Sequence, residues 1–97
     1  MSDRPTLRHV VFFSAKDKAD LPQIVAGLEL LSDIPDASLF EVRQNTQSDT
    51  LSSEVDVIVY AEFESAKALA AYKAHPLYEA SIQAVRPLRD MRIAADF

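Results

Sequence analysis

The sequence has no cysteine and only one glycine. The absence of cysteine excludes disulfides, thiolate nucleophiles and thiolate metal sites, and it is compatible with a reducing compartment. The glycine, Gly27, lies inside a predicted helix, so the sequence has neither a phosphate-binding glycine loop nor a dinucleotide-binding fingerprint. We therefore expect no nucleotide cofactor. We also expect no metal site, because the two histidines are widely separated in the sequence.

Basic side chains are in the minority, because 10 Lys and Arg stand against 15 Asp and Glu, for a formal net charge of −5. The basic residues are scattered singly along the sequence, so we expect no nucleic-acid partner. Residues 1–5 lead into only a short apolar run, which predicts neither a signal peptide nor a membrane span. These features favour a cytoplasmic location.

The length and composition are those of one globular domain. The 97 residues are 48% hydrophobic and 26% charged, which argues against disorder. A chain of this length is too short to form two domains with separate cores, so we expect a single domain over residues 1–97.

Hydrophobic patterning predicts four strands and two helical regions. The strands are expected at residues 7–14, 39–45, 55–63 and 88–97. The first helix follows Asp20, a candidate N-cap, and ends near residues 32–33. The second region runs from residue 66 to 86, starts at the N-cap Ser65 and is interrupted at Pro76. The order βαββαβ predicts an α+β, ferredoxin-like fold with a four-stranded antiparallel sheet.

The first and third strands are apolar on both faces. In the first strand, Val10 and Phe12 alternate with Val11 and Phe13, and the third strand repeats this pattern. Helices on one face of a sheet leave its other face uncovered. We therefore predict that a second copy packs sheet against sheet, forming a homodimeric α+β barrel. The alternative is a monomer whose helices and termini cover both faces.

Histidine and tyrosine are the side chains best suited to carry chemistry in this sequence. A histidine exchanges protons near neutral pH, and a tyrosine hydroxyl donates a hydrogen bond. His9 lies on an apolar strand face, while Tyr72 and Tyr78 flank His75 and Pro76. Together they could polarise a carbonyl and move a proton. The structural alternative is a paired core histidine and a corner between two helices.

Six short segments resemble those of a known family in both order and spacing. They are His9-Val10-Val11-Phe12-Phe13, Ile34-Pro35, Phe63-Glu64-Ser65, Tyr72-Lys73-Ala74-His75-Pro76, Arg86-Pro87-Leu88 and Asp96-Phe97. Over nearly its whole length the chain resembles the stress-responsive A/B barrel (Dabb) domain. This resemblance implies a dimeric α+β barrel.

The resemblance also implies a pocket. One member of the family is a plant polyketide cyclase that works without cofactor or metal. Tyr72 and His9 match its helix tyrosine and its first-strand histidine, whereas Tyr78 stands where its catalytic histidine lies. The implied pocket lies between the sheet and the helices. Its lining would be His9, Val11, Phe13, Val57, Val59, Ala61, Tyr72, Tyr78 and Ile82.

Three functions stay open at this point. The first is binding of a small hydrophobic or aromatic molecule in the implied pocket, where Arg92 would favour an anionic ligand. The second is a cofactor-free enzyme resembling a polyketide cyclase, an isomerase or a monooxygenase, in which Tyr72 acts with His9 or His75. The third is a purely structural or interaction module.

Overall fold

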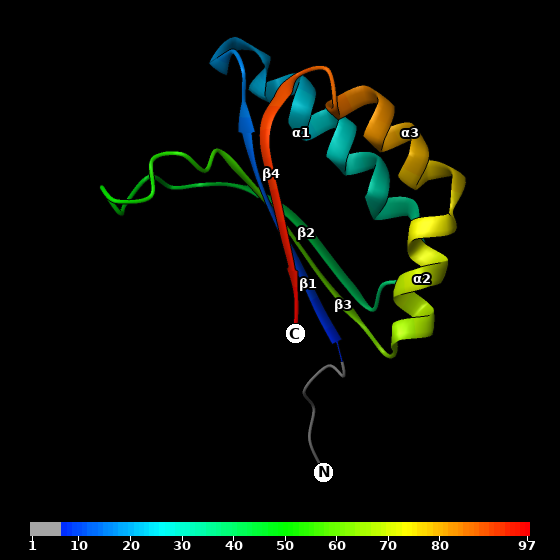
Figure 1. Cartoon of the computed structure of the whole chain (residues 1–97). Coiled ribbons are helices and arrows are strands. Elements are labelled where there is room, and N and C mark those ends of the chain that lie inside the picture. The colour runs from blue at the N-terminus through cyan, green and yellow to red at the C-terminus, as the bar shows by residue number, and fades with distance from the viewer. Residues whose placement is uncertain (1–6) are drawn as a thin grey trace.

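The computed structural model describes residues 7–97, and it has helices packed on a four-stranded antiparallel sheet (Figure 1). The strand order is β2-β3-β1-β4. This arrangement confirms the predicted α+β ferredoxin-like fold. The elements are β1 Leu7–Ala15, α1 Leu21–Glu29, β2 Leu39–Gln44, β3 Val57–Phe63, α2 Ala66–Ala74, α3 Pro76–Val85 and β4 Arg89–Asp96, with 3₁₀ turns at Lys18–Asp20 and Leu30–Asp33 on either side of α1.

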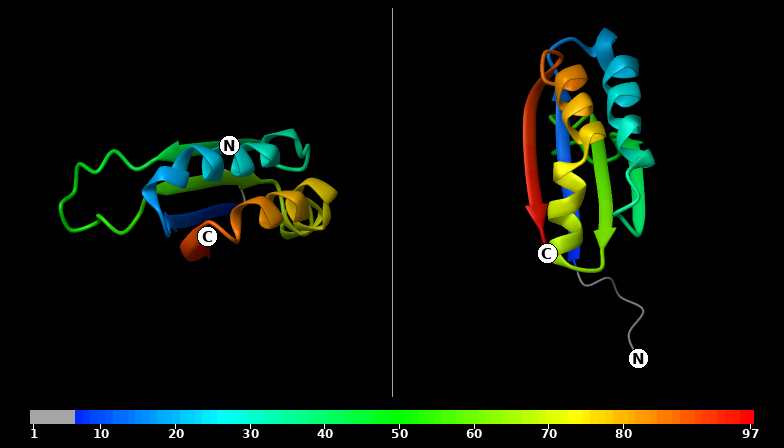
Figure 2. Two further views of the ribbon diagram at one scale, coloured as in Figure 1. Left: turned by 90° about the horizontal axis from the view of Figure 1, so that it is seen from above. Right: turned by 90° about the vertical axis from the view of Figure 1, so that its right-hand side faces the viewer.

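The core lies between the helices and one face of the sheet (Figure 2). In the antiparallel pairing of β1 with β3, Val11 lies opposite Val59 and Phe13 lies opposite Val57. Because side chains alternate along a strand, all four point to the same face, and all four are buried. None of the helices in the described part of the chain is long and apolar enough to cross a membrane.

The start of α1 differs from the sequence prediction. Asp20 directly precedes α1, but its side chain makes no capping hydrogen bond. Instead the carboxylate of Asp17 accepts a hydrogen bond from the backbone N–H of Ala19, at 3.0 Å. The reason is that a 3₁₀ turn leads directly into α1, so the first free backbone N–H groups lie three residues earlier than predicted.

The junction between α2 and α3 follows the prediction. Ser65 caps α2, where its hydroxyl accepts a hydrogen bond from the N–H of Ala68 at 3.1 Å. His75 is extended, Pro76 takes the first position of α3, and His75 Nδ1 accepts a hydrogen bond from the N–H of Leu77 at 3.1 Å. The corner is therefore set by proline sterics and closed by an imidazole cap.

The sheet face that carries no helices is apolar, as the sequence predicts. Val10 and Phe12 of β1 lie on this face, and Phe12 is paired with Ile58 of β3 and Ile93 of β4. The side chains of Ile93 and Phe97 are 56% and 61% exposed. An apolar stripe therefore crosses three strands without any cover from residues 7–97.

Candidate functional site

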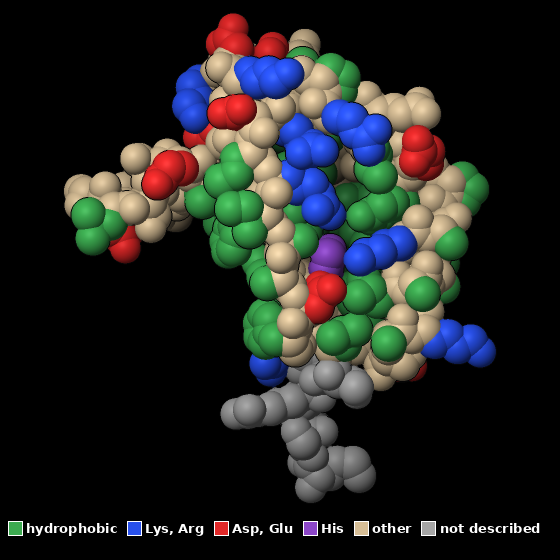
Figure 3. Space-filling model, in the orientation of Figure 1, with side chains coloured by type: hydrophobic (Ala, Val, Ile, Leu, Met, Phe, Trp, Pro, Cys, Tyr) green, Lys and Arg blue, Asp and Glu red, His purple; other side chains and the backbone are tan. Residues whose placement is uncertain are grey.

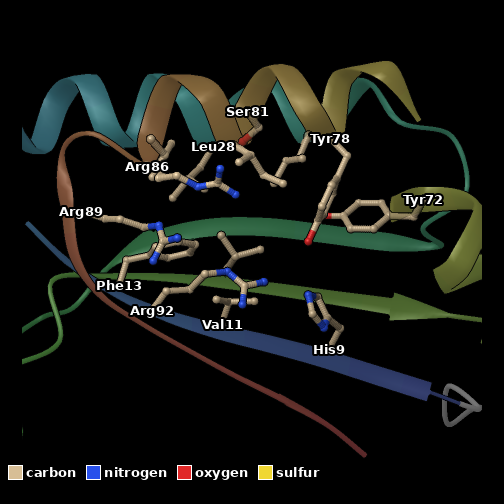
Figure 4. A pocket seen from close by; sticks show the side chains of 14 residues that line it. His9, Val11, Phe13, Leu28, Tyr72, Tyr78, Ser81, Arg86, Arg89 and Arg92 are labelled. Carbon is tan, nitrogen blue, oxygen red and sulfur yellow. The ribbon is translucent and has the colours of Figure 1, made fainter. Parts of the chain in front are cut away.

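A cavity of about 300 Å³ lies between the sheet and the helices. Figure 3 shows the same region as a hollow with basic side chains at its top and right, and with hydrophobic side chains and a histidine inside it. Strands β1, β3 and β4 and helices α1, α2 and α3 all contribute to its wall (Figure 4). The lining residues are His9, Val11, Phe13, Leu28, Leu31, Val59, Tyr72, Tyr78, Ser81, Ile82, Val85, Arg86, Arg89 and Arg92.

The middle of the cavity is apolar. Val11 and Phe13 of β1 and Val59 of β3 form its sheet side, because they alternate onto the face toward the helices. Ile82 and Val85, three residues apart on α3, are part of its helix side. Such a surface favours an apolar body of a ligand over water.

Aromatic rings and an imidazole meet at one end of the cavity. The ring centroids of His9 and Tyr72 are 6.4 Å apart, and those of Tyr72 and Tyr78 are 5.4 Å apart, with both pairs edge to face. Tyr72 is only 1% exposed. Burial, and secondarily the neighbouring Tyr78, raises the pKa of Tyr72 well above its ordinary value. Tyr72 therefore stays protonated and offers the cavity a hydrogen-bond donor.

His9 is held by a carboxylate. It is paired in register with Asp96 across β1 and β4, and His9 Nδ1 is hydrogen bonded to the Asp96 carboxylate. His9 is 2% exposed, whereas the Asp96 side chain is 39% exposed. A carboxylate at Nδ1 orients the ring and favours the tautomer in which Nε2 accepts a proton or hydrogen bond.

Three arginines line the cavity: Arg86 and Arg89 lie at the other end, and Arg92 extends from that end toward His9 (Figure 4). Arg86 caps the C-terminal end of α3, while Arg89 and Arg92 belong to β4. Burial lowers the pKa of Arg89, and the charges of Arg92 and Arg86 lower that pKa further. The cavity thus has a cationic end, an apolar middle and an end that carries His9 and Tyr72.

The model of the stress-responsive A/B barrel domain matches residues 7–97, which is nearly the whole chain. The chain belongs to the Dabb family. None of the curated proteins compared with it matches.

Solved structures show the same fold. The Dabb chain is similar to a dimeric ferredoxin-like protein of unknown function from Thermobifida fusca, with 22% identity, coverage of 94% of this chain and 88% of that one, and a TM-score of 0.79. It is also similar to a Dabb family protein with a ferredoxin-like fold from Mesorhizobium loti, with 20% identity, coverage of 97% and 96%, and a TM-score of 0.78. At these identities the likeness describes the fold.

The structure of this Dabb chain places most of the predicted site residues together. Val57 and Ala61 lie outside the cavity wall and belong to the buried core, because Val59 alone of the β3 residues reaches the cavity. His75 also lies outside the cavity wall, and its Nδ1 is engaged in the cap of α3. The predicted residues that do line the cavity are His9, Val11, Phe13, Val59, Tyr72, Tyr78, Ile82 and Arg92.

The sequence reasoning missed part of the wall of this Dabb cavity. Ser81 and Val85 lie three and seven residues after Tyr78, so helical periodicity contained the signal that would have found them. Leu28 and Leu31 lie three residues apart in the region predicted as the first helix, so the same periodicity places them on one face. Arg86 and Arg89 had no such signal, because a turn separates them and no periodicity continues through it.

Proposed function

We propose that this Dabb protein binds a small hydrophobic or aromatic molecule in the cavity between the sheet and the helices. The observation that carries the proposal is a cavity of about 300 Å³ with an apolar middle and polar groups at both ends. Ligand sites in proteins share these features: they are concave, mostly apolar, and orient their ligand with a few polar groups. A purely structural module would have no need to keep such a cavity open in a domain this small.

We also propose that the protein acts as a homodimer through the sheet face that carries no helices. Burying the exposed side chains of Ile93 and Phe97 removes apolar surface from water, which stabilises the pair. Two similarly folded proteins, from Thermobifida fusca and a Jannaschia species, are described as dimeric. Packing of the two bare faces would give the α+β barrel that the sequence predicts.

The test of ligand binding is a thermal-shift screen with small apolar and aromatic compounds. A ligand present at one hundred times its Kd stabilises the folded state by about 2.7 kcal/mol. For a domain of this size that free energy raises the Tm by about 10 °C or more. The substitution Ile82→Phe enlarges a side chain on the cavity wall and should abolish the shift, whereas Gln83→Phe adds the same ring at an exposed position of α3 and should preserve it.

If no compound raises the Tm, or if Ile82→Phe and Gln83→Phe retain the same shift, the cavity is not the binding site. Both variants are compared with the unsubstituted protein in the absence of ligand, so that a change in their own stability is measured separately.

A second candidate function is cofactor-free catalysis on a carbonyl compound. The observation that favours it is the pairing of His9 with Asp96 beside Tyr72. The Tyr72 hydroxyl would donate a hydrogen bond to the carbonyl oxygen, and His9 Nε2 would accept a proton from the adjacent carbon. His9→Gln or Tyr72→Phe should then abolish turnover while the Tm stays nearly unchanged. Equal losses of activity and stability would support a structural role for these residues instead.

A further inference from the structure

Three positive charges line the cavity in a protein whose formal net charge is −5. The ion pairs within the described residues 7–97 involve other side chains, and none of Arg86, Arg89 and Arg92 takes part in one. The cluster therefore differs from a surface salt-bridge network, in which each arginine would face a carboxylate.

Gathering three guanidinium groups without a carboxylate is unfavourable for the protein alone. Like charges repel, and the repulsion grows where protein atoms replace water. Arg89 is partly buried. Burial lowers its pKa most, and the charges of Arg92 and Arg86 lower that pKa further. An anion placed among the three groups would turn this repulsion into attraction.

We propose that Arg86, Arg89 and Arg92 form a subsite for an anionic group of the ligand, either a carboxylate or a phosphate. This inference rests on the proposed function, which is ligand binding in the cavity. The guanidinium group suits this task because its planar fork of N–H donors binds two oxygens of a carboxylate or phosphate at once. The three groups come from the end of α3 and from β4, and they are neighbours in the same cavity, with Arg92 the one that lies toward His9 (Figure 4).

The two ends of the cavity define the class of ligand further. From the arginines, the apolar wall formed by Val11 and its neighbours leads to the end that carries His9 and Tyr72 (Figure 4). Among residues 7–97, no hydrogen bond joins the Tyr72 hydroxyl to another protein group, so the hydroxyl is available to a ligand. The ligand is therefore a small organic anion with an apolar body and an oxygen acceptor at the end away from its charge.

The experiment compares two probes of the same shape and different charge. Isothermal titration calorimetry is run with phenylacetate, with its neutral analogue phenylacetamide, and with phenyl phosphate as a second anion. We expect the better anion to bind the unsubstituted protein at least about tenfold more tightly than phenylacetamide, because hydrogen bonds to charged groups are stronger than those between neutral groups. The comparison of phenylacetate with phenyl phosphate shows which anionic group the subsite prefers.

The arginines are then replaced one at a time. Arg89→Gln and Arg92→Gln should each weaken binding of the anion about tenfold or more, and should leave the affinity for phenylacetamide within about twofold. The matched control is Lys67→Gln, which removes one positive charge at an exposed position of α2 and should change neither affinity. Arg92 is itself exposed, so its substitution tests the subsite even if Arg89→Gln fails to fold.

The outcomes separate the subsite from the proposed function. If phenylacetamide binds as tightly as both anions and the arginine variants match Lys67→Gln, the subsite is overturned while ligand binding in the cavity stands. If none of the three probes binds but the thermal-shift screen yields a neutral ligand, the subsite is again overturned alone. If neither experiment yields a ligand of the cavity, both proposals fall.

Discussion

Gly27 lies where α1 packs closely against α3, and Gly27→Ala tests that packing. A Cβ atom built at Gly27 lies 2.8 Å from Val85 Cγ2 and 3.2 Å from Ala84 Cβ. In an exposed helix the change from glycine to alanine stabilises by about 1 kcal/mol. Here the added methyl group needs space that the structure does not provide.

Val85 cannot easily make that space. It is 2% exposed, and a β-branched side chain in a helix has one strongly preferred χ1 rotamer. The two helices must therefore move apart, and overpacking of this kind costs about 1–3 kcal/mol. The gain in helix propensity offsets part of this overpacking cost. We therefore expect Gly27→Ala to lower the free energy of unfolding by about 1–2 kcal/mol.

The assay is urea denaturation followed by circular dichroism, with all variants at one protein concentration because a dimer's stability depends on concentration. Ala26→Gly, at the exposed neighbouring position of α1, is the control and should cost about 1 kcal/mol from propensity alone. If Gly27→Ala raises the stability by about 1 kcal/mol, the same amount that Ala26→Gly loses, the close approach of α1 and α3 is refuted.

Two further predictions concern the bare sheet face and the buried tyrosine. Ile93→Asp should convert the dimer to a monomer in sedimentation analysis, because burying isoleucine contributes about 1.5–3 kcal/mol and each dimer contains two copies. Ala71→Asp, exposed on α2, should leave the dimer intact. The pKa of Tyr72 is raised in the folded protein, so its contribution to stability is complete below pH 10 and is lost as the pH rises above it. Chemical denaturation at pH 9 and at pH 11 measures this loss. Between these two pH values the free energy of unfolding should fall less in Tyr72→Phe than in the unsubstituted protein, and equal losses would contradict a buried phenol.

The strands and their faces were accessible from the sequence because alternation is a local pattern. The expected third strand, residues 55–63, contains the observed β3 Val57–Phe63, and Arg92 lies on the face opposite Ile93 as predicted. The helix cap at Asp20 was wrong, because a 3₁₀ turn before the helix has no clear signature in hydrophobic spacing. The cytoplasmic location stays a prediction.

The cavity was accessible only in part. Strand parity put His9, Val11 and Phe13 on one face, since side-chain direction follows from residue number along a strand, and the family resemblance implied that this face forms the wall. Which residue of β3 reaches the cavity depends on how the helices cover the sheet, and that coverage is not local. The arginine cluster depends on the path of the turn between α3 and β4, which brings Arg86 beside two residues of the last strand.

The account depends most on the cavity being the place where a small molecule binds, and methyl NMR tests this directly. The protein is labelled at the methyl groups of valine, leucine and isoleucine and titrated with the tightest compound of the thermal-shift screen. We predict that the methyl signals of Val11, Val59 and Ile82 shift with the titration, while those of Leu51, which is 87% exposed outside the cavity, stay in place. Shifts confined to Ile93 and the bare sheet face would contradict the account.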